Sequence, residues 1–237
     1  MMKEFLVSWD IAKQTDATVI QFWWLNPQII GEKGNERIYT FWTCDHIIKW
    51  EKLSYTEQVE KLAIILEGKD YKNNHYLLMD GTGVGQAVAD LCRSRKLKPI
   101  EIVFSGGIKE QPLYYGQSDQ RFGSNMDIKL QRGWSVPKVE MITSAHTLIQ
   151  QGRVPVPDDI PYAAEFKREL MHFEGRVNDK GHTTYGNDAE AKHDDFVAAF
   201  LMACWYIHKK LDKYTEIEKP VNKGSKSYDW NPLKVFS

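Results

Sequence analysis

The order of strand-like and helix-like segments is the feature that most limits the fold of this chain. Three runs rich in Val, Ile, Phe, Trp and Thr come first, at residues 4–10, 17–25 and 37–44, with short polar connections between them. Such runs predict strands, and their short connections predict an antiparallel meander. From residue 54 to residue 104, helix-like and strand-like segments alternate, which is typical of βαβ units. The sequence therefore predicts an α/β protein with a mixed sheet.

The alternating part begins with a clear helix signal. Ser54 and Glu57 have the spacing of a capping box, and apolar residues follow at helical intervals as far as Gly68. Three further segments follow in the order strand, helix, strand: 75–79, 86–97 and 99–104. Together with the meander, they predict a mixed sheet of five strands flanked by helices.

The second half of the chain combines one long connection with further helices. Residues 105–135 hold five glycines but also several aromatic residues, which favours a long loop or a hairpin over disorder. Helices are predicted at 137–151, 161–173 and 194–211, the first two of them beginning at a proline. The tail at 212–237 is rich in Lys and is expected to be loosely ordered. We therefore expect one domain at 1–211 followed by this tail.

Composition and charge exclude several classes of protein. With 31 Lys and Arg against 32 Asp and Glu, the chain has no bulk attraction for nucleic acid or membrane, although residues 91–138 carry nine basic and four acidic side chains. No apolar run approaches the ~20 residues that span a bilayer. The three cysteines form no zinc-binding pattern, and the first residues lack a secretory signal. A cytoplasmic protein without structural zinc is expected.

Acidic residues from three separate segments are the candidate metal ligands. Asp10 ends the first predicted strand, Asp80 ends the fourth, and Asp194 and Asp195 open the last helix. The ends of the two strands can be neighbours in a parallel pair, so the carboxylates can meet. Clustered carboxylates repel each other and suit a hard divalent cation such as Mg²⁺. Each Asp alone would more often be a turn former or a helix cap, and Asp16, a further candidate, is also expected as a turn residue.

The segment after Asp80 is rich in glycine. Gly81, Thr82 and Gly83 follow a buried strand, where glycine permits a strained turn, close approach of another backbone and contact with a phosphate. A dinucleotide-binding loop is the rival interpretation. However, the glycines lack the GxGxxG spacing, and Glu101 falls in the middle of a strand instead of at its end. A nucleotide cofactor is therefore not expected.

Histidine and basic side chains are candidates for contact with phosphate. His182 and His193 lie upstream of the last helix and could orient a water molecule or touch a phosphate, although a surface or capping role is commoner for such histidines. Arg132 and Lys138 are candidates for contact with backbone phosphates of a nucleic acid, against the plain alternative of solvated charges.

Several segments occur in a distinctive order. Four of them are Val7–Asp10, Met79–Gly85, Trp134–Lys138 and Lys192–Ala199, and three more lie between these, at 151–157, 166–173 and 181–185. This ordered set resembles the nuclease domain of large terminase subunits from tailed bacteriophages, over residues 4 to about 208. The His-Asp-Asp run before a helix of small residues is its most specific element.

The resemblance implies an RNase H-like fold, in agreement with the meander and βαβ order, and a DNA endonuclease. In such a domain Asp10, Asp80 and Asp195 would be the acidic triad that holds two Mg²⁺ or Mn²⁺ ions, with Asp194 and Asp16 as auxiliary ligands. The enzyme would cut concatemeric double-stranded viral DNA in the host cytoplasm during genome packaging. Its partners would be the terminase ATPase domain, the small terminase subunit and the portal.

Other classes of function stay open. A different RNase H-like nuclease, such as a Holliday-junction resolvase, would share the acidic cluster but prefer branched DNA or an RNA hybrid. A nuclease-dead DNA-binding or portal-binding module would bind without cutting. A dinucleotide-binding oxidoreductase would bind NAD and ignore metal.

Overall fold

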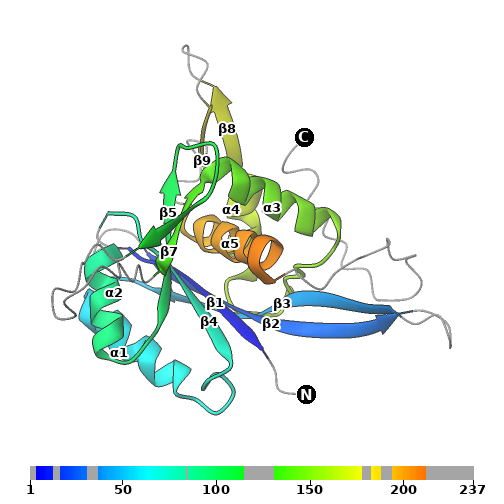
Figure 1. The fold of residues 1–237 in the computed structure, drawn as a ribbon. Coiled ribbons are helices and arrows are strands. Elements are labelled where there is room, and N and C mark those ends of the chain that lie inside the picture. Colours follow the sequence, from blue (N-terminus) through cyan, green and yellow to red (C-terminus); the bar gives the residue numbers. More distant parts are fainter. Residues whose placement is uncertain are drawn as a thin grey trace, which may run out of the picture.

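A mixed sheet of seven strands forms the centre of the molecule (Figure 1). The computed structural model describes residues 4–12, 17–30, 37–83, 85–114, 131–177, 183–187 and 194–211. In spatial order the strands are β3 (Arg37–Trp50), β2 (Thr18–Ile30), β1 (Phe5–Asp10), β4 (His75–Asp80), β5 (Pro99–Ser105), β7 (Gln131–Pro137) and β6 (Gln111–Tyr114). β1, β2 and β3 are antiparallel, β1, β4, β5 and β7 are parallel, and β6 is antiparallel to β7. This is the predicted meander followed by parallel strands.

The sheet has two strands more than the five predicted. Both begin in the segment 105–135, where β6 and β7 pair antiparallel, as a hairpin would require, while residues 115–130 lie outside the described residues. The sequence of β7, Gln-Arg-Gly-Trp-Ser-Val-Pro, lacks the alternation of apolar and polar residues that predicts a strand. Its parallel pairing with β5 depends on contacts distant in the sequence, which no local pattern reveals.

Helices cover both faces of the sheet (Figure 1). On one face lie α1 (Tyr55–Leu66) and α2 (Gly85–Ser94), over a core that contains Val7, Trp9 and Met79. On the other lie α3 (Lys138–Gln150), α4 (Ala163–Met171) and α5 (Asp195–Tyr206), over a core that contains Leu6 and Leu78. Because strand residues alternate between faces, each core takes every second residue of β1 and β4.

The helices predicted from local signals are confirmed, whereas the structure of one polar stretch was not predicted. The capping box before α1 is present, with the Ser54 hydroxyl accepting from the Glu57 N–H and the Glu57 carboxylate accepting from the Ser54 N–H. In contrast, the polar stretch after α4 contains an unpredicted two-stranded sheet of β8 (Phe173–Val177) and β9 (Thr183–Asn187). The alternation of apolar and polar residues in β8, Phe-Glu-Gly-Arg-Val, covers only five residues, and β9, Thr-Thr-Tyr-Gly-Asn, does not alternate.

Helix α5 is buried on all sides. The sequence predicts one apolar face, but every residue of α5 from Phe196 to Tyr206 is buried, because the helix lies between the sheet and the helices α3 and α4. A π-helical turn, Ile207–Leu211, continues it. Among the described residues, none of the helices combines the length and the apolar character needed to cross a membrane.

The far end of α5 is fixed to the hairpin β6–β7. Trp205 Nε1 donates to Glu110 Oε2 at 3.0 Å, and Lys210 Nζ donates to Glu110 Oε1 at 2.6 Å. Lys210 Nζ also lies 3.5 Å from the centroid of the Trp134 ring, a cation–π distance. These contacts hold the described C-terminal residues against the sheet, whereas the predicted tail at 212–237 lies outside the described residues.

Candidate active site

Two aspartates meet at neighbouring strand ends. Trp9 of β1 is the register partner of Met79 of β4, so Asp10 and Asp80 are the next residues of two adjacent parallel strands. Leu6 and Leu78 belong to the core beneath α5, and strand alternation places Asp10 and Asp80 on that same face. The sequence-based expectation that these carboxylates lie at neighbouring strand ends is therefore confirmed.

Asp10 is the buried centre of an acidic cluster. It is only 9% exposed, and burial is the largest cause that raises its pKa well above the usual 3.8. The negative charges of Asp80, Asp195, Asp194 and Glu169 raise its pKa further, in that order. The structure thus brings acidic side chains from β1, β4, α4 and the start of α5 into one electrostatic neighbourhood.

The glycine-rich segment after Asp80 forms a tight turn. The Thr82 N–H donates to Asp80 Oδ1 at 2.7 Å, and Gly83 has a φ of +64°, a conformation that favours glycine. A Cβ atom on Gly85 would lie 2.5 Å from the Asp80 carbonyl oxygen. The predicted strained turn and close backbone approach are confirmed. Burial raises the pKa of Asp80, while the hydrogen bonds from Thr82 and the charge of Lys138 act in the opposite direction.

A lysine bridges the strand ends and the start of α5. Lys138 is the first residue of α3, and its Nζ atom lies 3.3 Å from Asp194 Oδ2. Its charge also lowers the pKa of Asp80, so it acts on carboxylates from two elements. Asp194 is the N-cap residue of α5, but its side chain makes no capping hydrogen bond.

A second lysine reaches the cluster from β3. Lys49 Nζ donates to Glu165 Oε1 of α4 at 2.6 Å. Burial lowers the pKa of Lys49, but the hydrogen bond and charge of Glu165 outweigh it, and the charge of Asp195 adds to the rise. The net pKa lies above its ordinary value, so Lys49 stays positively charged at the margin of the cluster.

Glu169 of α4 was not a sequence-predicted site residue. It is buried, and its Oε1 atom accepts from the Val197 N–H at 2.8 Å. Burial raises the pKa of Glu169 to about 8; the Val197 hydrogen bond opposes this, and the charges of Asp195 and Asp194 reinforce it. An acidic residue in a helix of mixed polarity gives no sequence signal for such a position, because only the packing of α4 against α5 creates it.

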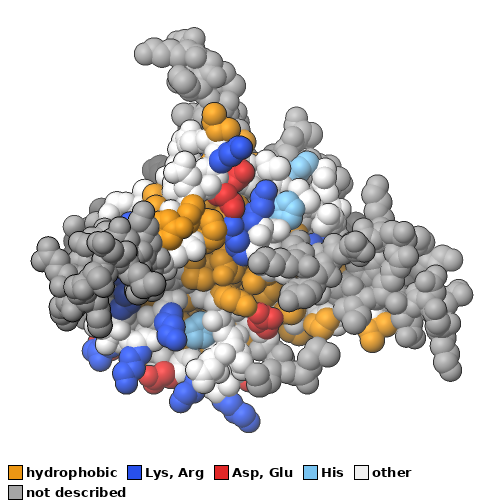
Figure 2. Space-filling view, viewed as in Figure 1, with side chains coloured by type: hydrophobic (Ala, Val, Ile, Leu, Met, Phe, Trp, Pro, Cys, Tyr) orange, Lys and Arg blue, Asp and Glu red, His pale blue; other side chains and the backbone are white. Residues whose placement is uncertain are grey.

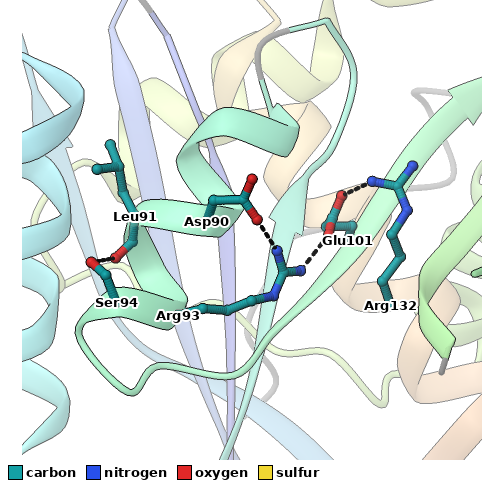
Figure 3. A network of polar contacts seen from close by, with 6 residues as sticks. All are labelled: Asp90, Leu91, Arg93, Ser94, Glu101 and Arg132. Atoms are coloured by element: carbon teal, nitrogen blue, oxygen red, sulfur yellow. Dashed lines mark hydrogen bonds and ion pairs between the residues drawn. The ribbon is translucent and has the colours of Figure 1, made fainter. Parts of the chain in front are cut away.

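Arg132, a predicted phosphate contact, belongs to an ion-pair network on the opposite face of the sheet (Figure 3). Arg132 Nη1 donates to Glu101 Oε2 at 2.8 Å, and Arg93 Nη2 donates to Glu101 Oε1 at 2.6 Å. The Glu101 side chain is completely buried in the middle of β5. A Cβ atom on Gly81 would lie 3.2 Å from Glu101 Cβ, so the network packs directly behind the turn that follows Asp80.

The donor atoms of the cluster fit a hard divalent cation. Buried carboxylates that raise one another's pKa need positive charge to stay ionised at neutral pH, and carboxylate oxygens are the ligands that Mg²⁺ and Mn²⁺ prefer. Within the part of the chain that the structure describes, however, no three His, Cys, Asp or Glu side chains stand close enough together to hold a metal ion. The predicted site residues Asp16, His182 and His193 lie outside the described residues.

Positive side chains gather on the surface over α1, α2 and the turn after α1 (Figure 2). The exposed basic residues of α1, of the turn after it and of the segment after α2 are Lys61, Lys69, Lys72, Arg95, Lys96 and Lys98, and Glu57, Glu67 and Asp70 are exposed in the same region. They lie on the side of the sheet where α2 begins, five residues after Asp80. The overall net charge of −1 does not reveal this local group of basic side chains.

Comparisons with known proteins agree with this architecture. The solved nuclease domain of the large terminase of Thermus phage P74-26 has a similar fold, with a TM-score of 0.50 and 16% sequence identity, over 86% of this chain and 78% of that one. No curated protein sequence matches the chain. The family model of the terminase RNaseH-like domain matches residues 7–206, which include both strand-end aspartates and all of α5. The chain therefore belongs to the family of terminase RNase H-like domains.

Proposed function

We propose that the protein is a divalent-metal-dependent endonuclease that cuts concatemeric double-stranded viral DNA during genome packaging. The observation that carries the proposal is the register of β1 and β4, which places Asp10 and Asp80 at neighbouring strand ends, with acidic side chains of α4 and of the start of α5 near enough to raise the pKa of Asp10. Membership of the terminase RNase H-like family supports it. A resolvase-like preference for branched DNA has no observation in its favour in this structure.

The residues of the cluster have distinct roles in this proposal. Asp10, Asp80 and Asp195 would hold two Mg²⁺ or Mn²⁺ ions, with Asp194 and Asp16 as auxiliary ligands. The chemistry that such ions supply when bound is activation of a water molecule and stabilisation of the leaving oxygen of a phosphodiester. Lys138, which acts on both Asp80 and Asp194, would orient the phosphate and balance the negative charge around it.

The DNA would be held through its phosphates. Lys138 and the backbone of the turn at Gly81–Gly83 stand beside the carboxylates. Arg132 is a weaker candidate for this role, because Glu101 already engages its guanidinium. Phosphate contacts carry little sequence information, so we expect low sequence preference and strong salt dependence. In a packaging complex the ATPase domain, the small subunit and the portal would deliver the DNA.

The test of the proposed function is cleavage of supercoiled plasmid in the presence of Mg²⁺ or Mn²⁺. We expect nicked and linear products that disappear when EDTA is added. A parallel panel of linear duplex, four-way junction and RNA–DNA hybrid identifies the preferred substrate. Cleavage that persists in EDTA, or that occurs only on the junction or the hybrid, would remove the proposed function.

Divalent metal should also raise the melting temperature of the protein. Binding to the folded state alone stabilises it by about 2.7 kcal/mol at a concentration a hundredfold above Kd, which corresponds to several degrees for a chain of this size. The measurement is thermal unfolding with Mg²⁺ or Mn²⁺ against NaCl of equal ionic strength. Identical melting curves across the millimolar range would contradict a metal site in the acidic cluster.

A further inference from the structure

Asp194, the N-cap residue of helix α5, does not cap the helix with its side chain. The first N–H groups of a helix have no partner within it, and an Asp at the N-cap usually accepts from one of them. Asp194 occupies that position, yet its side chain makes no capping hydrogen bond and lies 3.3 Å from Lys138 Nζ. Since Phe196 and Val197 are buried, water cannot readily satisfy their N–H groups.

A carboxylate from another helix fills this role. Glu169 Oε1 of α4 accepts from the Val197 N–H at 2.8 Å. Gln21 of β2 fixes the same turn of α5, because its Nε2 atom donates to the Phe196 carbonyl oxygen at 2.9 Å. The first turn of α5 is therefore held from outside the helix, by α4 and by β2.

We propose that Glu169 is a positioning residue that caps α5 in place of Asp194 and thereby leaves the carboxylates of Asp194 and Asp195 facing the acidic cluster. The inference rests on the proposed function only for its consequence at the metal site. The capping itself depends only on the hydrogen bond from the Val197 N–H to Glu169. Without Glu169, the side chain of Asp194 is the nearest acceptor in the sequence for the unpaired N–H groups, and it would turn away from Lys138 to reach them.

Three substitutions separate capping from a role of negative charge. Glu169→Gln keeps an acceptor oxygen at the same reach and removes the charge. Glu169→Asp keeps the charge and withdraws the acceptor by one methylene, and Glu169→Ala removes both. Capping predicts that Gln preserves the first turn of α5 and that Asp and Ala do not. If Glu169 were instead a metal ligand, the Asp variant would bind metal better than the Gln variant, because Asp keeps the negative charge.

The first measurement is hydrogen exchange at the Val197 amide, without metal or DNA. We expect slow exchange in the wild type and in Glu169→Gln, and at least tenfold faster exchange in Glu169→Asp. If Glu169→Ala does not fold, the Gln and Asp variants still decide the question. Equal exchange in the wild type and in Glu169→Asp, or equally fast exchange in Gln and Asp, would overturn the capping role.

The second measurement is the Mn²⁺ concentration that gives half of the maximal rise in melting temperature. Loss of a contact that orients metal ligands typically weakens metal binding about 10-fold to 100-fold, and we expect that loss in Glu169→Asp and a smaller one in Glu169→Gln. A wild type that shows no response to Mn²⁺ would remove the proposed function while the exchange result still stands. A larger loss in Gln than in Asp would overturn the positioning role.

Discussion

Replacing Asp10 by Asn should abolish cleavage and, at the same time, make the metal-free protein more stable. Asp10 is the buried centre of the cluster, so under the proposed function its loss removes a ligand that no other described residue replaces at that strand end. Residues that act as one catalytic unit lose activity steeply on single substitution, and we expect a fall of about 10³-fold or more in the rate of plasmid cleavage.

The gain in stability follows from the pKa of the same group. Burial first, and then the charges of Asp80 and Asp195, raise the pKa of Asp10 above 3.8. A carboxyl group with a higher pKa in the folded chain gives its full stabilisation only below the pKa of the unfolded chain. That stabilisation is lost as the pH rises through the folded value. Asn carries no charge at any pH, so Asp10→Asn should melt at a higher temperature than the wild type at neutral pH in EDTA.

Thermal unfolding in EDTA at mildly acidic and at neutral pH tests this argument. The wild type should lose stability between the two conditions, and Asp10→Asn should lose less. Asp70→Asn is the matched control, because Asp70 is exposed in the turn before the amino end of β4. It should keep both the cleavage rate and the melting temperature of the wild type. If the Asp10→Asn protein cuts DNA at the wild-type rate, Asp10 is not an active-site residue.

Replacing Glu101 by Gln should destabilise the fold strongly. The Glu101 carboxylate is completely buried and accepts from both Arg93 and Arg132, so the neutral amide would leave two guanidinium groups without their ion pair. Breaking a buried pair costs about 3–5 kcal/mol. Because both arginines are partly exposed, we expect the lower end, about 3 kcal/mol, which lowers Tm by roughly 2–4 °C for each kcal/mol.

An ion pair on the surface provides the control for Glu101. Glu60 pairs with Arg95 between exposed side chains, and such pairs contribute about 0.2–1 kcal/mol. Chemical denaturation of Glu101→Gln and Glu60→Gln should therefore give clearly different free energies of unfolding. Equal values would mean that water replaces the lost ion pairs of Arg93 and Arg132. The network would then not support the turn after Asp80.

The parts of the structure that follow from local patterns were predictable. The capping box at Ser54 and Glu57, the strand ends at Asp10 and Asp80, and the turn with Gly83 each depend on residues close together in the sequence. The meander and the parallel strands follow from the order of apolar runs, since consecutive strands with short connections have few ways to pair.

What could not be predicted depends on contacts between distant segments. Glu169 occurs in a helix whose acidic residues resemble solvated ones, and only the packing of α4 against α5 aims it at Val197. Arg132 resembled a free phosphate ligand because its partner Glu101 is 31 residues away and meets it through the register of β5 and β7. The strands β8 and β9 have five residues each, and only β8 alternates apolar and polar residues, a pattern too short to stand out from the polar stretch around it.

The burial of α5 from Phe196 to Tyr206 makes the position of its first residue, Asp195, sensitive to substitutions at a distance. Protein interiors are packed as densely as organic crystals, so a larger side chain at Ala199 or Ala203 cannot be accommodated by a shift of side chains alone. The helix would have to move as a body, and Asp195 would move with it. Under the proposed function, substitutions along this helix are therefore limited by the metal site as well as by folding, even at positions that no substrate touches.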